Sequence, residues 1–182
     1  MNDDSAAQAP ACLADGAPPA TPEALFARFE ALGIEARSFS HDPVFTVGEA
    51  KALRGELAGA HIKNLFLRNK KRELWLVTCL EDRRIDLKAL AKALDAGRFS
   101  FGNAELLMAR LGVIPGAVTP LGVINDHEGA VRVVLDKALL AVSPVNCHPL
   151  VNHMTTALAP GDLVRFLEAE GHPPQVLDFD TL

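Results

Sequence analysis

The chain is short of cysteine and has no long apolar run, and both shortages narrow the classes of protein to which it can belong. Its three cysteines, Cys12, Cys79 and Cys147, lie far apart and form no CxxC pair, which favours reduced thiols over a disulfide framework. No stretch is apolar for long enough to cross a bilayer. The first four residues, MNDD, are acidic where a signal peptide needs positive charge. We therefore expect a cytoplasmic protein with no membrane contact.

The signatures of several common catalytic sites are also missing. The sequence has no Walker motif, Rossmann fingerprint or GxSxG elbow. Cys147, His148 and His153 are close in sequence, but they lack the fourth ligand and the CxxC spacing of a zinc site. We expect no metal and no cofactor. The net charge of −5 provides no global basic field, so any contact with nucleic acid must come from a local patch.

What the sequence does contain is enough apolar material for one domain. The chain has 182 residues, of which 49% are hydrophobic, and this is sufficient to bury a full core. Residues 1–20 are rich in Ala, Pro, Asp and Gly without periodicity, which predicts a disordered tail. Residues 21–182 mix helical and strand patterns without a strict βαβ rhythm. This mixture predicts an α/β fold, with a mixed sheet surrounded by helices.

The clearest local signal is a β-hairpin, which consists of the strand HIKNLFLR, the polar turn NKKR and the strand ELWLVTCL. The second strand is apolar on both faces, as expected of a buried central strand. Lys63 shares a face with leucines in the first strand. It is either an edge-strand lysine that reaches solvent or a pocket residue with a polar or anionic partner. Asn64, on the opposite face, offers both a donor and an acceptor.

A second signal is the stretch GVIPGAVTPLGVIND, from Gly112 to Asp126. Pro115 and Pro120 each fix φ and Gly116 can take a positive φ, so the stretch is expected to be a rigid, non-repetitive loop. Backbone N–H groups in GAVT have no evident strand partner and could bind a carbonyl or an oxyanion. The alternative is a purely structural crossover.

Two further features offer binding groups. His148 lies in an irregular segment before a proline, where it is either a structural hydrogen-bonding residue or part of a site. The hairpin turn carries Lys70, Lys71 and Arg72, with Arg68 before them and Arg83 and Arg84 soon after. This cluster is either a local cationic patch suited to phosphates or a solvated turn.

Taken together, these segments resemble the YbaK/ProX superfamily of aminoacyl-tRNA deacylases, editing domains related to the insertion domain of bacterial prolyl-tRNA synthetase. The matching segments are FTVGEA (45–50), KNLFL (63–67) with its partner WLV, GAVTPLG (116–122) and CHPL (147–150). The resemblance covers about residues 21–179. The GxxxP pattern in the third segment is similar to that of the free-standing branch, ProXp-ala or PrdX, that clears alanine from proline tRNA.

The resemblance implies a mixed β-sheet or partial barrel wrapped by helices, and a hydrolase that cleaves the ester between an amino acid and the terminal adenosine. Lys63 is similar to the family's essential lysine and would hold a phosphate or the aminoacyl group. Gly116 would bind the ester carbonyl through its backbone, and His148 would help to position the substrate or a water. The substrate-binding residues that it implies are Phe45, Thr46, Asn64, Ala117, Val118, Thr119 and Pro120. The family is thought to use the adenosine's own 2′-hydroxyl to help activate the water.

The same resemblance implies partners. The acceptor end of tRNA(Pro) would bind with help from Lys70, Lys71 and Arg72, and prolyl-tRNA synthetase is a second partner to consider, for a protein expected to be a monomer. Two alternatives remain open: removal of cysteine rather than alanine from proline tRNA, and a non-catalytic module that binds tRNA or the synthetase.

Overall fold

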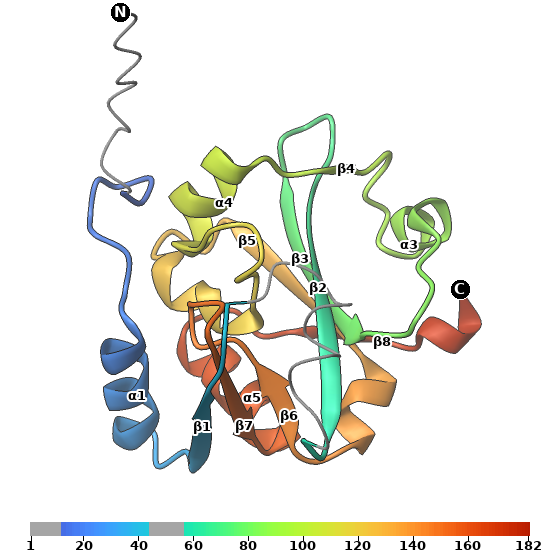
Figure 1. Cartoon of the computed structure of the whole chain (residues 1–182). Helices are drawn as coiled ribbons and strands as arrows, with labels where there is room; N and C mark the ends of the chain where they lie inside the picture. The colour runs from blue at the N-terminus through green and yellow to red at the C-terminus, as the bar shows by residue number, and fades with distance from the viewer. Residues whose placement is uncertain (1–11, 44–56) are drawn as a thin grey trace, which may run out of the picture.

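The computed structural model describes residues 12–43 and 57–182 (Figure 1). Its α-helices are α1 (Pro22–Ala31), α3 (Leu87–Ala93), α4 (Ala104–Leu111) and α5 (Pro160–Ala169), and its 3-10 helices are η1 (Pro120–Asn125), η2 (Lys137–Ala141) and η3 (Phe179–Thr181). Its strands are β1 (Ala36–Ser40), β2 (Ala60–Arg68), β3 (Leu74–Leu80), β4 (Ser100–Phe101), β5 (Val131–Asp136), β6 (Val145–Cys147), β7 (Met154–Leu158) and β8 (Gln175–Leu177). The predicted α/β fold is confirmed.

The strands form one eight-stranded mixed sheet in the order β1-β7-β6-β2-β3-β5-β8, with β4 paired to β2 outside this path. The pairs β1–β7, β6–β7 and β2–β3 are antiparallel, whereas β2–β6, β3–β5 and β5–β8 are parallel. The path begins at β1 and ends at β8, so the sheet of the described residues is open rather than closed into a barrel.

The predicted hairpin lies at the centre of this sheet. Its register pairs Lys63 with Cys79 and Asn64 with Thr78. The turn is closed by a hydrogen bond of 3.1 Å from the Asn69 N–H to the carbonyl of residue 73. All but the last residue of β3 are buried, because β2 and β5 cover both of its edges and side chains pack on both of its faces. The prediction of a buried central strand is therefore confirmed.

Two apolar clusters lie on the two faces of the hairpin. The main core contains Phe66 and Leu76 together with side chains from α1, α4, α5 and η1. The smaller core contains Leu67, Trp75 and residues of α3. Because successive strand residues point to opposite faces, β2 supplies Phe66 to one core and Leu67 to the other. This alternation decides which face of the sheet each polar residue of β2 reaches.

Residues 12–20 differ from the prediction of a disordered tail. Leu13 is buried, and the N–H of Ala14 donates a hydrogen bond of 2.7 Å to the carbonyl of Ala109 in α4. Ala20 donates from its N–H to Oδ1 of Asn125 at 2.7 Å. One buried leucine and these backbone bonds attach the segment to the domain, and composition alone gave no sign of them. Residues 1–11 and the segment FTVGEA (45–50) lie outside the described residues.

The cysteines are free thiols, as predicted. Cys12 is exposed, whereas Cys79 and Cys147 are buried. Burial raises the pKa of the Cys147 thiol, so this thiol stays protonated near neutral pH. In the part of the chain that the structure describes, no helix has the length and apolar character needed to cross a bilayer.

Candidate functional site

Asn125, near the end of the glycine–proline stretch, is hydrogen-bonded to the residue before its start. Helix α4 ends at Gly112, which takes a left-handed φ of 64°, and a side chain at this position would meet the Asn125 amide. That amide donates from Nδ2 to the carbonyl of Leu111 at 2.9 Å. The stretch is not irregular throughout, because Pro120 starts the 3-10 helix η1 and the Thr119 hydroxyl caps it by accepting from the N–H of Leu121. The free loop is therefore residues 113–119.

Within this loop, part of the backbone remains available to a ligand. Gly116 has φ of 91°, as the prediction of a positive φ required. The N–H of Ala117 donates to the carbonyl of Ile114 at 3.0 Å. Among the described residues, the N–H groups of Gly116, Val118 and Thr119 make no hydrogen bond. Of these residues, Gly116 and Val118 are partly exposed, and such donors on a rigid loop can stabilise a carbonyl oxygen that gains negative charge.

The five predicted loop residues differ in their exposure. Ala117, Thr119 and Pro120 are buried, and the side chain of Ala117 packs in the main core. Gly116 and Val118 are half-buried. A ligand can therefore reach the backbone of Gly116 and the surface of Val118, while the other three residues support the loop from below.

Asn64 connects this loop to the sheet. Its Nδ2 donates to the carbonyl of Val118 at 2.8 Å, and its Oδ1 accepts from the Thr78 hydroxyl at 2.7 Å. Thr78 is its partner across the β2–β3 pair. The hydrogen bond between Asn64 and Val118 thus joins the strand to the loop. Both ends of its amide are occupied, so its orientation is fixed.

Lys63 lies on the other face of β2. Its cross-strand partner is Cys79, and its ammonium donates a hydrogen bond to the backbone carbonyl of Arg83. In the described part of the chain this ammonium makes no ion pair. The sequence left Lys63 as either a solvent-reaching lysine or a pocket residue with a polar partner, and its observed contact is to the backbone of the segment after β3. The sequence could not reveal this contact, because Arg83 lies 20 residues away.

His148 follows β6 and belongs to a small group of polar residues at the end of β1, β6 and β7. Its Nδ1 lies 2.9 Å from the carbonyl of Met154, which can only accept, so Nδ1 carries the hydrogen. Burial lowers the pKa of His148, against the effect of this hydrogen bond, and the nearby His41 lowers it further. The ring is therefore neutral near pH 7, and Nε2 presents an acceptor.

Sequence reasoning missed the neighbours of His148. The rings of His41 and His148 have centroids 6.3 Å apart. His41 places Nδ1 2.7 Å from the carbonyl of Asp42 and Nε2 2.9 Å from the hydroxyl of Thr155. The only sequence signal was the HDP turn at His41, which indicated a turn and no function. Phe45 and Thr46, predicted to bind substrate, lie outside the described residues.

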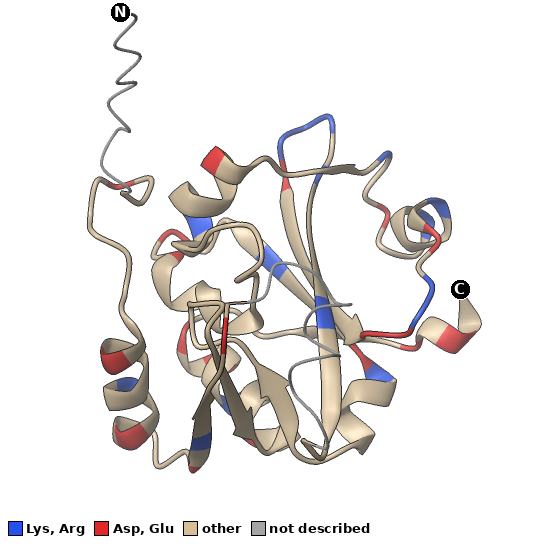
Figure 2. Cartoon of the chain, viewed as in Figure 1, with Lys and Arg blue, Asp and Glu red and all other residues tan. Residues whose placement is uncertain are grey.

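The cationic turn is exposed as predicted. Lys70, Lys71 and Arg72 are all exposed, and Figure 2 shows their positive charge at the tip of the β2–β3 hairpin. Arg83 does not join this patch, because it follows the opposite end of β3. It forms ion pairs with Asp136 at 2.6 Å and with Asp180 at 2.7 Å. The patch at the turn is therefore smaller than the sequence indicated.

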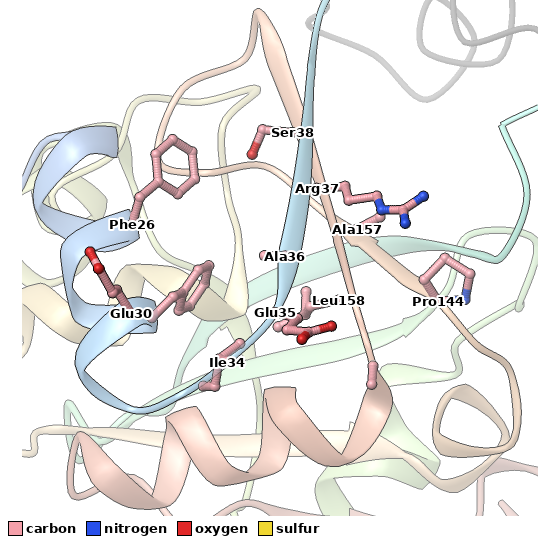
Figure 3. Close-up of a pocket in the computed structure, with 12 residues that line it drawn as sticks. Phe26, Glu30, Ile34, Glu35, Ala36, Arg37, Ser38, Pro144, Ala157 and Leu158 are labelled. Atoms are coloured by element: carbon pink, nitrogen blue, oxygen red, sulfur yellow. The ribbon is translucent and has the colours of Figure 1, made fainter.

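A hollow of about 860 Å³ lies beside the edge strand β1. Its lining comes from α1, β1, β7 and the segment before β6 (Figure 3). It includes Phe26, Glu30, Arg37 and Pro144, and none of the described residues predicted for the site. We therefore place the candidate site at the loop, Asn64 and His148 rather than in this hollow. Among the described residues, no group of His, Cys, Asp or Glu side chains is arranged to hold a metal ion.

The fold and these segments define an editing domain that acts on aminoacyl-tRNA. The family described as the aminoacyl-tRNA editing domain matches residues 41–166, and the chain belongs to this family. Its enzyme class is accordingly aminoacyl-tRNA deacylase.

Individual relatives cover most of the chain. The Prolyl-tRNA synthetase associated domain-containing protein 1 of Bos taurus is 41% identical over 162 residues, which are 86% of this chain and 94% of that protein. The Prolyl-tRNA editing protein ProX of Acetoanaerobium sticklandii is 37% identical over 151 residues, which are 82% of this chain and 92% of that protein. A solved structure of a candidate trans-editing enzyme for prolyl tRNA synthetase superposes with a TM-score of 0.65 at 21% identity, over 86% of this chain and 94% of the other. At that identity the superposition supports the fold alone.

Proposed function

We propose that this protein is a trans-editing hydrolase that removes alanine from mischarged Ala-tRNA(Pro). A synthetase pocket built for proline cannot strongly exclude the smaller alanine, because each missing methylene sacrifices only about 1–3 kcal/mol. A second site that accepts alanine and rejects proline by steric clash restores fidelity. The relatives named for prolyl-tRNA support this choice of tRNA. The protein would act as a monomer in the cytoplasm.

The observation that carries the proposal is the set of N–H donors on the loop. The N–H groups of Gly116 and Val118 would polarise the ester carbonyl and stabilise the oxyanion that forms when water attacks. Asn64 keeps them in place by its hydrogen bond of 2.8 Å to the Val118 carbonyl. Because the donors are fixed before the substrate binds, they need no reorganisation during the reaction. The half-buried surface of Val118 would contact the methyl group of alanine.

His148 belongs to the proposed site, and Lys63, on the opposite face of β2, would contact the substrate from outside it. The neutral His148 presents Nε2 as an acceptor, which would orient the attacking water or the ribose hydroxyl. Lys63 carries no counter-ion among the described residues, so its charge would attract a phosphate of the terminal nucleotides. Its ammonium would act as an electrostatic clamp rather than as a base. Phe45 and Thr46 remain proposed substrate-binding residues.

The exposed turn would bind the tRNA itself. Lys70, Lys71 and Arg72 can contact backbone phosphates without reading the sequence of the RNA. We also propose that the protein docks on prolyl-tRNA synthetase, which would bring the turn close to newly charged tRNA.

A comparison of three substrates tests the proposed function. The purified protein is mixed with tRNA(Pro) charged with alanine, cysteine or proline, and release of the amino acid is followed over time. We expect rapid hydrolysis of the alanyl ester only. Preference for the cysteinyl ester would assign the alternative substrate, and release of none of the three would leave a non-catalytic binding module. The spontaneous hydrolysis of each ester without protein is the baseline.

A further inference from the structure

Arg83 is held on three sides by residues distant in sequence. Its Nε lies 2.6 Å from Asp136 and its NH1 lies 2.7 Å from Asp180. Its guanidinium carbon is 5.9 Å from the centre of the Phe179 ring. Asp136 is fully buried, so an unpaired charge there would be costly. Arg83 therefore joins the end of β5 to the C-terminal turn η3.

The same residue also holds Lys63. The backbone carbonyl of Arg83 accepts a hydrogen bond from the Lys63 ammonium, and the backbone is fixed in turn by a bond of 3.1 Å from the Arg83 N–H to the carbonyl of Leu80. A neutral carbonyl restricts the rotamers of the lysine side chain but, among the described residues, leaves its positive charge uncompensated.

Asp136 lies on the same face of the sheet as Lys63, because Lys63 pairs with Cys79 on one side and Asp136 follows Leu135, the partner of Thr78, on the other. The thiol of Cys79 has a pKa raised to about 11, mainly by burial, and three charges modulate it: Lys63 and Arg83 lower it and Asp136 raises it. The charges of all three groups act on the same buried thiol. The Asp136 carboxylate is occupied by Arg83 through Oδ2 and by the N–H of Ala138 through Oδ1. Without Arg83, Lys63 is a cation on the same face of the sheet that could neutralise this buried carboxylate.

We propose that Arg83 is a positioning residue for Lys63: its guanidinium occupies the Asp136 carboxylate, and its carbonyl directs the Lys63 ammonium. The charge of Lys63 is thereby kept available for an anionic group of the substrate. This proposal deepens the function proposed above and rests on it, because it assumes that Lys63 contacts the aminoacyl-tRNA.

Replacement of Arg83 by methionine tests this arrangement in the full chain. Two quantities are measured: the rate at which acetyl N-hydroxysuccinimide modifies Lys63, read by mass spectrometry of its peptide, and kcat and KM for deacylation of Ala-tRNA(Pro). In Arg83→Met, Lys63 should pair with Asp136, so its modification should slow and kcat should fall by about tenfold to a hundredfold. In Arg83→Met with Asp136→Asn, both should recover, because asparagine keeps the Oδ1 acceptor for Ala138 but carries no charge.

The matched control is Arg28→Met, which removes another arginine–carboxylate pair, to Glu170 at 2.6 Å, far from Lys63. We expect it to leave the modification of Lys63 and kcat unchanged. A loss of folding in Arg83→Met would not be repaired by a second substitution. Recovery of kcat and of Lys63 modification in the double variant would therefore show that Arg83 acts by positioning Lys63. Unchanged modification and kcat in Arg83→Met would overturn the proposal. If Lys63→Ala retains full activity, the role of Lys63 in the proposed function fails, while the modification rates still decide whether Arg83 positions it.

Discussion

His172 and Asp126 form a buried pair, with His172 Nε2 2.9 Å from Asp126 Oδ2. Both residues are 4% exposed. Nδ1 of the same ring faces the carbonyl of Glu170 at 2.8 Å, which can only accept. Nδ1 therefore carries a hydrogen, and Nε2 must carry one as well to bond a carboxylate. The pair is an imidazolium–carboxylate bridge between the end of α5 and the turn before β5.

This bridge predicts a pH-dependent stability. Burial lowers the pKa of His172, but the hydrogen bonds to Asp126 and Glu170 and the charges of both outweigh it, so the pKa is raised above 6.5. A raised pKa in the folded state means that the stabilisation is complete below about pH 6.5 and is lost as the pH rises through the folded-state value. Urea unfolding between pH 6 and pH 9 should show a falling free energy of unfolding. His172→Gln should flatten this slope, and an equal slope in the variant would contradict the assignment.

Replacement of Asn64 by alanine should disable the loop. The change leaves the carbonyl of Val118 and the hydroxyl of Thr78 without their partner, which costs about 1–3 kcal/mol of stability. The loop donors then lose their anchor, and kcat should fall by about a hundredfold. Thr78→Val is the matched control, because it removes the neighbouring hydrogen bond but keeps the bond to the loop. Equal kcat values in both variants would show that Asn64 does not act through the loop.

Gly116→Ala, compared with Gly129→Ala, tests whether the backbone geometry of the loop is needed for deacylation or whether backbone strain anywhere in the chain has the same effect. At φ of 91° a side chain costs about 1–2 kcal/mol, so the loop should shift and turnover should drop. Gly129→Ala places the same strain at φ of 63° in an exposed turn, where an added Cβ meets no atom within 4 Å. We expect similar losses in Tm but a loss of deacylation only in the first variant. Retained hydrolysis with unchanged preference for alanine would remove the loop from carbonyl binding.

The cationic turn predicts a salt-dependent affinity. Replacing Lys70, Lys71 and Arg72 by glutamine should weaken tRNA binding and reduce the slope of log K against log salt by about 2–3. The control replaces three other exposed cations, Arg84, Lys88 and Lys92, which lie at and before α3 and change the net charge equally. Titration at several salt concentrations compares the two proteins. An identical slope in the two proteins would show that the turn does not contact the tRNA.

Local patterns were sufficient to predict the hairpin and the loop. Alternation placed Lys63 and Asn64 on opposite faces of one strand, and the positive φ at Gly116 followed from the spacing of glycine and proline. Each of these two predictions depends only on residues within about ten positions of one another in the sequence. The sequence Ser143–Pro149, predicted as irregular, contains the short strand β6, because its pairing with β2 and β7 is decided by distant residues.

The contacts of the charged residues could not be predicted from the sequence. Arg83 was assigned to the cationic patch, yet its partners lie 53 and 97 residues further along the chain. His41 and His148 meet only because β1 pairs with β7. Pairings of this range depend on the topology of the sheet, and no periodicity in the sequence encodes them.

Asn125 links the start of the described chain to the loop. One end of its amide bonds the Leu111 carbonyl at the base of the loop, and the other accepts from the N–H of Ala20. A shortened protein that begins at Thr21 would lose this donor, along with the buried Leu13, and the amide would keep only its bond to the Leu111 carbonyl. Trimming the first twenty residues to improve expression or crystal growth would thus alter the enzyme at its loop while leaving the sheet intact.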